Sequence, residues 1–161
     1  MDYLWTPWRY HYITNAIAGE KTECIFCDAA KRSDDDVTLV VHRGVSSFVI
    51  LNRFPYTSGH LMIVPYKHTA EISGVNSATL TEMMQLAQRA ETAFKSLYKP
   101  DGMNFGMNLG RAAGAGIAGH VHLHGLPRWI GDASFMSVTG ETRVLPEDLS
   151  TTFSRLRAAL A

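Results

Sequence analysis

The chain has 161 residues, of which 46% are hydrophobic and 19% are charged, the composition of an ordinary globular protein. Its 15 basic and 15 acidic side chains cancel to a formal net charge of zero, which argues against a general nucleic-acid binder. No stretch approaches the length of a membrane span, and the N-terminus lacks the pattern of a signal peptide. We therefore expect a cytoplasmic protein that binds neither nucleic acid nor a membrane.

The length predicts one domain over residues 1–161, with an N-terminal extension over 1–36 and a core over 37–161. The first 18 residues are too aromatic for a disordered tail, so we expect them to pack on the body of the protein or on a partner subunit. The extension also holds the only two cysteines, Cys24 and Cys27. In a reducing compartment, this Cys-x-x-Cys spacing favours metal or redox chemistry over a structural disulfide.

Short β-rich runs bounded by turn residues predict a hairpin followed by a third strand. The hairpin strands cover residues 37–43 and 46–52, and the third strand covers 60–64. Two later strands are predicted over 103–108 and 120–127.

A long amphipathic helix is predicted over residues 76–98, because apolar side chains recur there at spacings of three and four. Thr79 and Glu82 resemble a capping box at its start. We expect Met83 and Met84 to fill the core.

A short amphipathic helix is predicted over residues 146–160 at the end of the chain. Three strands, a long helix, two strands and a terminal helix suit an antiparallel sheet with helices packed on it. The fold class expected from this order is α+β.

Three of the seven histidines, His120, His122 and His124, alternate with apolar residues. In a strand, residues two apart point to the same face, so the three imidazoles would stand in one row. Neutral imidazole is a nucleophile, a proton carrier and a metal ligand near neutral pH. The preceding Gly/Ala-rich residues 110–119 could bring backbone N–H groups close to a phosphate. They do not form a P-loop, because no Gly-Lys-Ser/Thr follows.

Residues 120–129, HVHLHGLPRW, resemble the histidine-triad (HIT) motif of nucleotide hydrolases and transferases. Residues 51–53 and 59–65 resemble the ribose-binding and second-histidine region of the Fhit-like branch of this family. Residues 4–10 and 131–136 resemble bacterial diadenosine-tetraphosphate phosphorylase-like members. Gly125 departs from the motif, which has an apolar residue there, and we expect it to loosen the strand without touching a reacting group.

The resemblance implies a HIT-like five-stranded antiparallel sheet with one long helix and a C-terminal helix, in a homodimer whose sheet continues across the two-fold axis. It also implies that His122 attacks the α-phosphorus of a nucleotide and forms a nucleotidyl-histidine. For this, His122 must be neutral, with its second ring nitrogen held by a hydrogen bond, for which a backbone carbonyl is the usual acceptor. His124 would bind a phosphate oxygen, and His60 would support the row, although alone it could be an ordinary core histidine.

The substrate-binding candidates lie in the loops. Asn52 matches the ribose contact of the family, although asparagine is also common before a turn. The phosphate contacts are expected from the Gly/Ala-rich loop and its neighbours, namely Asn108, Arg111, Gly116 and Gly119.

Zinc-binding members of the HIT superfamily imply a ligand set of Cys24, Cys27, His68 and His120 in this sequence. Two thiolates and two imidazoles make a closed structural zinc site. Such an ion would orient the triad segment and would not activate water. The alternative is a pair of reduced cysteines without a metal.

The leading expectation is an enzyme that cleaves diadenosine polyphosphates, with diadenosine tetraphosphate converted to ATP and ADP by inorganic phosphate. If water were the acceptor, the enzyme would be a hydrolase. Three alternatives remain: a HIT enzyme that cleaves AMP–amine or AMP–sulfate bonds, a nucleotide-binding sensor with little turnover, and a redox protein using the two cysteines. The redox protein is disfavoured because no βαβ pattern surrounds the cysteines.

Overall fold

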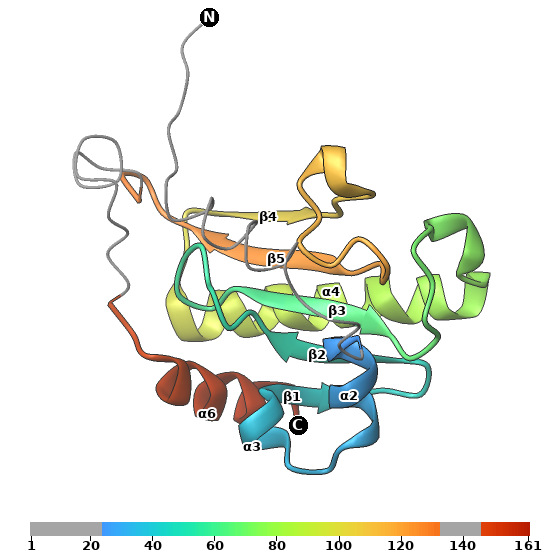
Figure 1. Ribbon diagram of the computed structural model, residues 1–161. Coiled ribbons are helices and arrows are strands. Elements are labelled where there is room, and N and C mark those ends of the chain that lie inside the picture. The colour runs from blue at the N-terminus through green and yellow to red at the C-terminus, as the bar shows by residue number, and fades with distance from the viewer. Residues whose placement is uncertain (1–23, 133–145) are drawn as a thin grey trace, which may run out of the picture.

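One antiparallel sheet organises the chain in the computed structural model, which describes residues 24–132 and 146–161. Its strand order is β1-β2-β3-β5-β4 (Figure 1). The strands are β1 (Val40–Arg43), β2 (Ser47–Leu51), β3 (Leu61–Pro65), β4 (Gly102–Gly106) and β5 (Leu123–Arg128). The predicted packing of residues 1–18 and the resemblance of residues 4–10 concern a segment outside the described ranges, as does the resemblance of residues 131–136 for all but its first two residues. These predictions stay predictions.

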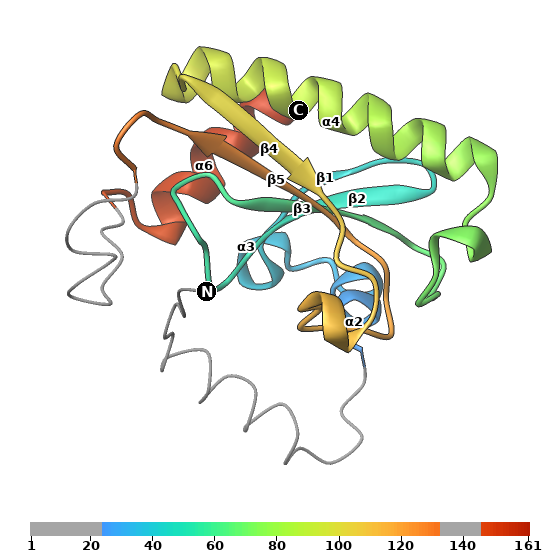
Figure 2. The same ribbon diagram turned by 90° about the horizontal axis from the view of Figure 1, so that it is seen from above.

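Different helices pack on the two faces of the sheet, and an apolar cluster lies on each face. Helix α4 (Ser77–Tyr98) and helix α6 (Leu149–Leu160) pack on one face, where Leu61, Ile63 and Leu123 join the larger cluster. On the other face, Phe26 of helix α2 (Ile25–Lys31) packs against strand residues that include Met62. Figure 2 shows α4 along one side of the sheet and α2 on the other. The α+β prediction of a five-stranded antiparallel sheet with one long and one C-terminal helix is confirmed.

The long helix begins one residue later than predicted and is capped differently. Asn76 is the N-cap, and its side chain accepts a hydrogen bond of 2.8 Å from the Thr79 N–H. The capping-box prediction was therefore wrong. Glu82 instead accepts hydrogen bonds from the backbone N–H groups of Val45 and Ser46, at 2.6 and 2.7 Å, and so ties α4 to the β1–β2 turn.

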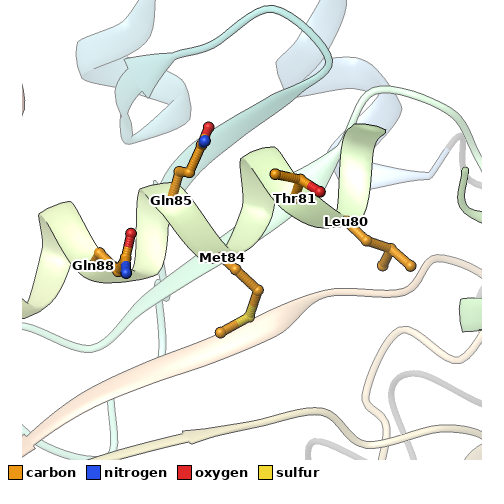
Figure 3. A pocket seen from close by; sticks show the side chains of 5 residues that line it. All are labelled: Leu80, Thr81, Met84, Gln85 and Gln88. Atoms are coloured by element: carbon orange, nitrogen blue, oxygen red, sulfur yellow. The ribbon is translucent and has the colours of Figure 1, made fainter. Parts of the chain in front are cut away.

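The adjacent methionines of α4 have different surroundings. Met83 is buried in the larger cluster, as predicted, whereas 56% of Met84 is exposed. A helix turns by about 100° per residue, and this turn places Met84 outside the apolar stripe that contains Met83. Met84 lies with Leu80, Thr81, Gln85 and Gln88 along a groove on the outside of α4 (Figure 3).

The first hairpin strand was predicted too long. Residues 35–38 form a single helical turn, α3 (Asp35–Thr38), in which the backbone N–H groups of Val37 and Thr38 both donate to the Asp34 carbonyl. Leu39 then has a positive φ of 67°, which ends the turn before β1 begins. The β-branched Val37 and Thr38 suggested a strand, but the local hydrogen bonds at Asp34 outweigh that preference. Helix α2 was not predicted at all.

None of the helices within residues 24–132 and 146–161 is both long and apolar enough to cross a membrane.

Gly125 does not loosen β5, contrary to the expectation from the motif. Gly125 is paired on both sides: Leu61 of β3 lies opposite it at the end of the β3–β5 pairing, and Phe105 of β4 lies opposite it in the continuous β4–β5 pairing. A Cβ atom at this position would lie 2.9 Å from Leu61 Cδ1 and 2.9 Å from Phe105 Cε1. The side chains of Leu61 and Phe105 thus fill the space that an apolar residue occupies in the motif.

We expect Gly125→Val to lower the free energy of unfolding by about 1–3 kcal/mol through overpacking, because Leu61 is buried and must shift. Catalytic activity should change little, because the Gly125 position faces the α4 side of the sheet and His124 faces the other. Urea unfolding and steady-state kinetics measure the two effects. Gly102→Ala is the matched control, since a Cβ there meets nothing within 4 Å. A Gly125→Val protein as stable as the wild type would contradict this packing.

Candidate active site and metal centre

The three alternating histidines do not all lie in a strand. Strand β5 begins at Leu123, so His120 and His122 precede it and only His124 belongs to it. The pairing with β3 ends at Ile63 and Leu123, and the Val121 N–H donates instead to the Thr69 carbonyl at 2.7 Å. The prediction of a strand from residue 120 was therefore wrong, because β5 begins three residues later.

This departure gives each histidine different neighbours. The ring of His120 lies 4.9 Å from the ring of His68, between centroids, and points into the cysteine cluster. The rings of His122 and His124 lie 4.8 Å apart in a T-shaped arrangement. His120 thus belongs to a metal-type cluster, whereas His122 and His124 form a second group.

His122 is held in one orientation by its own backbone. Its Nδ1–H donates to the carbonyl oxygen of His120 at 2.8 Å, and only 4% of the residue is exposed. A neutral imidazole that donates from Nδ1 has its lone pair on Nε2. Burial lowers the pKa of His122 below its usual value and so favours the neutral form. The arrangement is suited to a nucleophile.

A chain of hydrogen bonds fixes the protons of His60 and His124. The Tyr56 N–H donates to His60 Nδ1 at 3.1 Å, which leaves the proton of neutral His60 on Nε2. This Nε2–H donates to His124 Nδ1 at 2.9 Å, so His124 has its own proton on Nε2. Burial, with a smaller contribution from nearby His122, lowers the pKa of His124 to about 4. His124 is thus a neutral donor beside His122.

Asn52 lies next to the His60–His124 pair. Its Nδ2 is 3.4 Å from His60 Nε2, and its Oδ1 accepts a hydrogen bond of 2.9 Å from the Phe54 N–H. The loop between β2 and β3 therefore brings one predicted substrate-binding residue to the histidines.

The predicted phosphate-binding residues lie in one connection of the chain. Asn108, Arg111, Gly116 and Gly119 lie in the connection from β4 to β5, which includes the short helix η2 (Arg111–Ala113). Arg111, Gly116 and Gly119 are exposed, and a Cβ on Gly119 would lie 3.9 Å from His68 Nε2. Within residues 24–132 and 146–161, no hydrogen bond joins any of these four residues to the triad histidines.

Arg128, at the end of β5, is a cation in the same region of the sequence, but its guanidinium already has partners. Nε and Nη2 donate to the Asp132 carboxylate at 2.5 and 2.8 Å, and Nη1 donates to Asn104 Oδ1 at 2.8 Å. This bidentate pair occupies the donors that would bind an anion.

Four metal-ligand side chains meet at the N-terminal end of α2. The ligand atoms of Cys24, Cys27, His68 and His120 all lie within 4.8 Å of one another. His120 Nδ1 is 3.4 Å from Cys24 Sγ, and His68 Nδ1 is 3.3 Å from Cys27 Sγ. A tetrahedral zinc ion separates sulfur and nitrogen ligands by roughly 3.5 Å, so these side chains fit such an ion.

The orientation of His120 also suits a metal ligand. Its Nε2–H donates to the Pro65 carbonyl at 2.9 Å, which leaves Nδ1 free of a proton and directed at the cysteines. The predicted set of four ligands is therefore brought together.

Two residues near the histidines were not predicted from the sequence. Phe26, between the two cysteines, is fully buried and contacts the rings of His120 and His122, with centroid distances of 5.4 and 5.1 Å. The Tyr56 ring lies 4.7 Å from the His60 ring, between centroids, with an interplanar angle of 34°. The sequence offered one signal for each residue: Phe26 lies within the Cys-x-x-Cys segment, and Tyr56 lies four residues before His60.

The chain resembles known proteins in its sequence. The family model described as the HIT domain matches residues 35–129. A Mycobacterium tuberculosis protein named AP-4-A phosphorylase is 37% identical, over 92% of this chain and 79% of its own length. A Dictyostelium discoideum protein named Bis(5'-adenosyl)-triphosphatase is 28% identical, over 51% of this chain and 54% of its own length.

A solved structure also resembles this fold. It is a zinc-bound histidine triad family protein from Mycobacterium smegmatis, with a TM-score of 0.68 and 30% identity, covering 86% of this chain and 93% of that protein. With the family model matching more than half of the sequence, the chain belongs to the histidine-triad (HIT) family of nucleotide hydrolases and transferases.

Proposed function

We propose that this protein cleaves diadenosine polyphosphates, diadenosine tetraphosphate above all, through a nucleotidyl intermediate on His122. The observation that carries the proposal is the hydrogen bond from His122 Nδ1–H to the His120 carbonyl, because it leaves a lone pair on a buried, oriented Nε2. The substrate class is supported by the relative named AP-4-A phosphorylase, which matches nearly the whole chain.

The proposed reaction has two steps. His122 Nε2 attacks the α-phosphorus of diadenosine tetraphosphate, a P–N bond forms, and the P–O bond to the leaving group breaks to release ATP. Inorganic phosphate then attacks the same phosphorus, the P–N bond breaks, and ADP leaves with His122 restored. Covalent catalysis divides one difficult displacement into two easier ones.

The neighbouring residues would orient and stabilise the phosphate. His124 Nε2–H would donate to a phosphate oxygen, and His60 would hold His124 in the donating tautomer. Asn52 would bind the ribose, consistent with its position beside His60. The remaining phosphate contacts are assigned to Asn108, Arg111, Gly116 and Gly119, whose loop would have to approach the substrate.

We assign one structural zinc ion to Cys24, Cys27, His68 and His120, a set supported by its clustered ligand atoms and by the zinc-bound relative. The ion would fix the His120 side chain, and the His120 carbonyl accepts the hydrogen bond that orients His122. The Phe26 ring, packed against both histidines, would strengthen that link.

We further propose a cytoplasmic homodimer. Two zinc-binding thiolates suit a reducing compartment. Strand β4 is an edge strand, and Asn104, Phe105 and both of its glycines are exposed, so a second copy could pair with it. Sedimentation analysis measures the oligomeric state.

The His124 ring is expected to titrate near pH 4, well below the ordinary value of 6.5. Protonation at Nδ1 would break the hydrogen bond from His60, and the groups that face His124 are His60, His122 and Tyr56. Because the pKa of His124 is lower in the folded protein than in the unfolded chain, neutral His124 contributes to the free energy of unfolding above about pH 6.5. This contribution is lost as the pH falls toward 4. NMR titration of labelled histidine measures the value, and a midpoint at 6.5 or above would contradict the hydrogen-bond chain.

Incubation with diadenosine tetraphosphate, followed by phosphorus NMR of the products, tests the proposed acceptor. With inorganic phosphate present, we expect ATP and ADP in equal amounts, at a rate that rises with phosphate concentration. AMP and ATP at a rate independent of phosphate would mean that water is the acceptor and that the enzyme is a hydrolase.

A further inference from the structure

Tyr56 covers the His60–His124 pair on the side of the β2–β3 loop. Its ring lies 4.7 Å from the His60 ring with an interplanar angle of 34°, and 6.3 Å from the His124 ring with an angle of 30°. Tyr56 itself is 38% exposed, whereas His60 is only 1% exposed. The tyrosine is thus partly exposed, while its ring lies against the more deeply buried imidazole of His60.

The backbone of Tyr56 acts on the same pair. Its N–H donates to His60 Nδ1 at 3.1 Å, and a backbone N–H can only donate. This contact therefore selects the tautomer in which His60 Nε2 holds the proton. The next hydrogen bond, to His124 Nδ1, passes that selection to His124.

The preference for one tautomer of His60 and His124 depends on keeping water away from their hydrogen bond. A hydrogen bond between neutral rings is stronger in a low-dielectric interior, whereas in water it competes with solvent for the same donor and acceptor. Without the Tyr56 ring, water could donate to His124 Nδ1 or accept from His60 Nε2. His124 would then populate both tautomers, and only one of them has a proton on Nε2.

We propose that Tyr56 is a positioning residue, whose backbone N–H and ring together hold the His60–His124 pair so that His124 presents Nε2–H beside His122. The inference rests on the proposed function for its kinetic consequence. The tautomer itself can be measured without substrate.

The test compares Tyr56→Ala and Tyr56→Phe with the wild type. Both variants retain the backbone N–H, but only Tyr56→Phe retains the ring. In Tyr56→Ala we expect the ring-nitrogen NMR shifts of His124 to move toward the average of the two tautomers. We also expect kcat to fall on the order of 10-fold, with a smaller change in KM, which is less than for complete loss of an oriented donor because His124 still populates the donating tautomer part of the time. Tyr56→Phe should restore both the shifts and kcat.

Val45→Ala, a change at an exposed residue of the β1–β2 turn, is the control for loss of a surface side chain. Thermal unfolding of Tyr56→Ala shows whether the fold is retained, as expected for a partly exposed residue. Wild-type His124 shifts in Tyr56→Ala would overturn the inference, whatever the activity. If the wild type did not cleave diadenosine tetraphosphate, the proposed function would fail, while the NMR comparison would still decide the role of Tyr56.

Discussion

Replacing His122 with alanine is expected to lower kcat/KM for diadenosine tetraphosphate by on the order of 10⁴-fold or more, because removal of a covalent nucleophile eliminates the two-step path. The hydrogen bond from His122 Nδ1–H to the His120 carbonyl leaves a lone pair on His122 Nε2 and orients it for attack. His124 cannot substitute, because its Nδ1 already accepts from His60. Steady-state kinetics with product separation measures the loss.

His42→Ala is the matched control, since His42 lies in β1 and contacts Arg89 of α4 on the other side of the molecule. We expect this variant to retain wild-type kinetics. Near-normal turnover by His122→Ala would exclude the covalent mechanism.

The second large effect is expected at the metal centre. Cys24→Ser should abolish stable zinc binding and lower the melting temperature by on the order of 10 °C, because a closed zinc site contributes its binding energy to folding. The sheet and its larger apolar cluster lie apart from the ligands, so we expect the variant to remain folded at low temperature. Metal analysis and calorimetry measure the two changes.

Asp36→Ser serves as a surface control for the cysteine variant, because Asp36 is exposed and does not belong to the ligand cluster. It should leave both the zinc content and the melting temperature unchanged. Wild-type protein purified without chelators should contain one zinc ion per chain, and its absence would refute the assignment.

Much of the fold could be predicted from hydrophobic periodicity, which depends on which face of an element is buried. The long helix and the five strands were found for this reason, with boundaries that differ by a few residues. The errors arose where local hydrogen bonds decide the conformation. Hydrogen bonds to the Asp34 carbonyl stabilise a helical turn over residues 35–38. The hydrogen bond from the Val121 N–H to the Thr69 carbonyl replaces the strand pairing at His120 and His122.

The candidate site was predicted unevenly for a similar reason. Residue types and the family motif identified the metal ligands and the triad histidines, which the structure gathers. The order of donors and acceptors could not be predicted, because it depends on the Tyr56 N–H and on two backbone carbonyls. Motifs specify side chains, whereas these contacts come from the path of the main chain.

The phosphate contacts remain predictions for a different reason. Arg111 and the neighbouring glycines belong to a long exposed connection, and the sequence of such a loop does not determine its path. Arg128 shows the opposite case, in which a residue of suitable charge is occupied by the Asp132 carboxylate.

The most direct test of the covalent mechanism is mass analysis of the enzyme during turnover. Protein mixed briefly with diadenosine tetraphosphate, without added phosphate and without acid, should have one AMP attached to the peptide that spans residues 112–128. His122→Ala should show no adduct, whereas His42→Ala should be labelled like the wild type. An enzyme that turns over with no label on this peptide, or with the AMP on another residue, would contradict the assignment of His122 as the nucleophile.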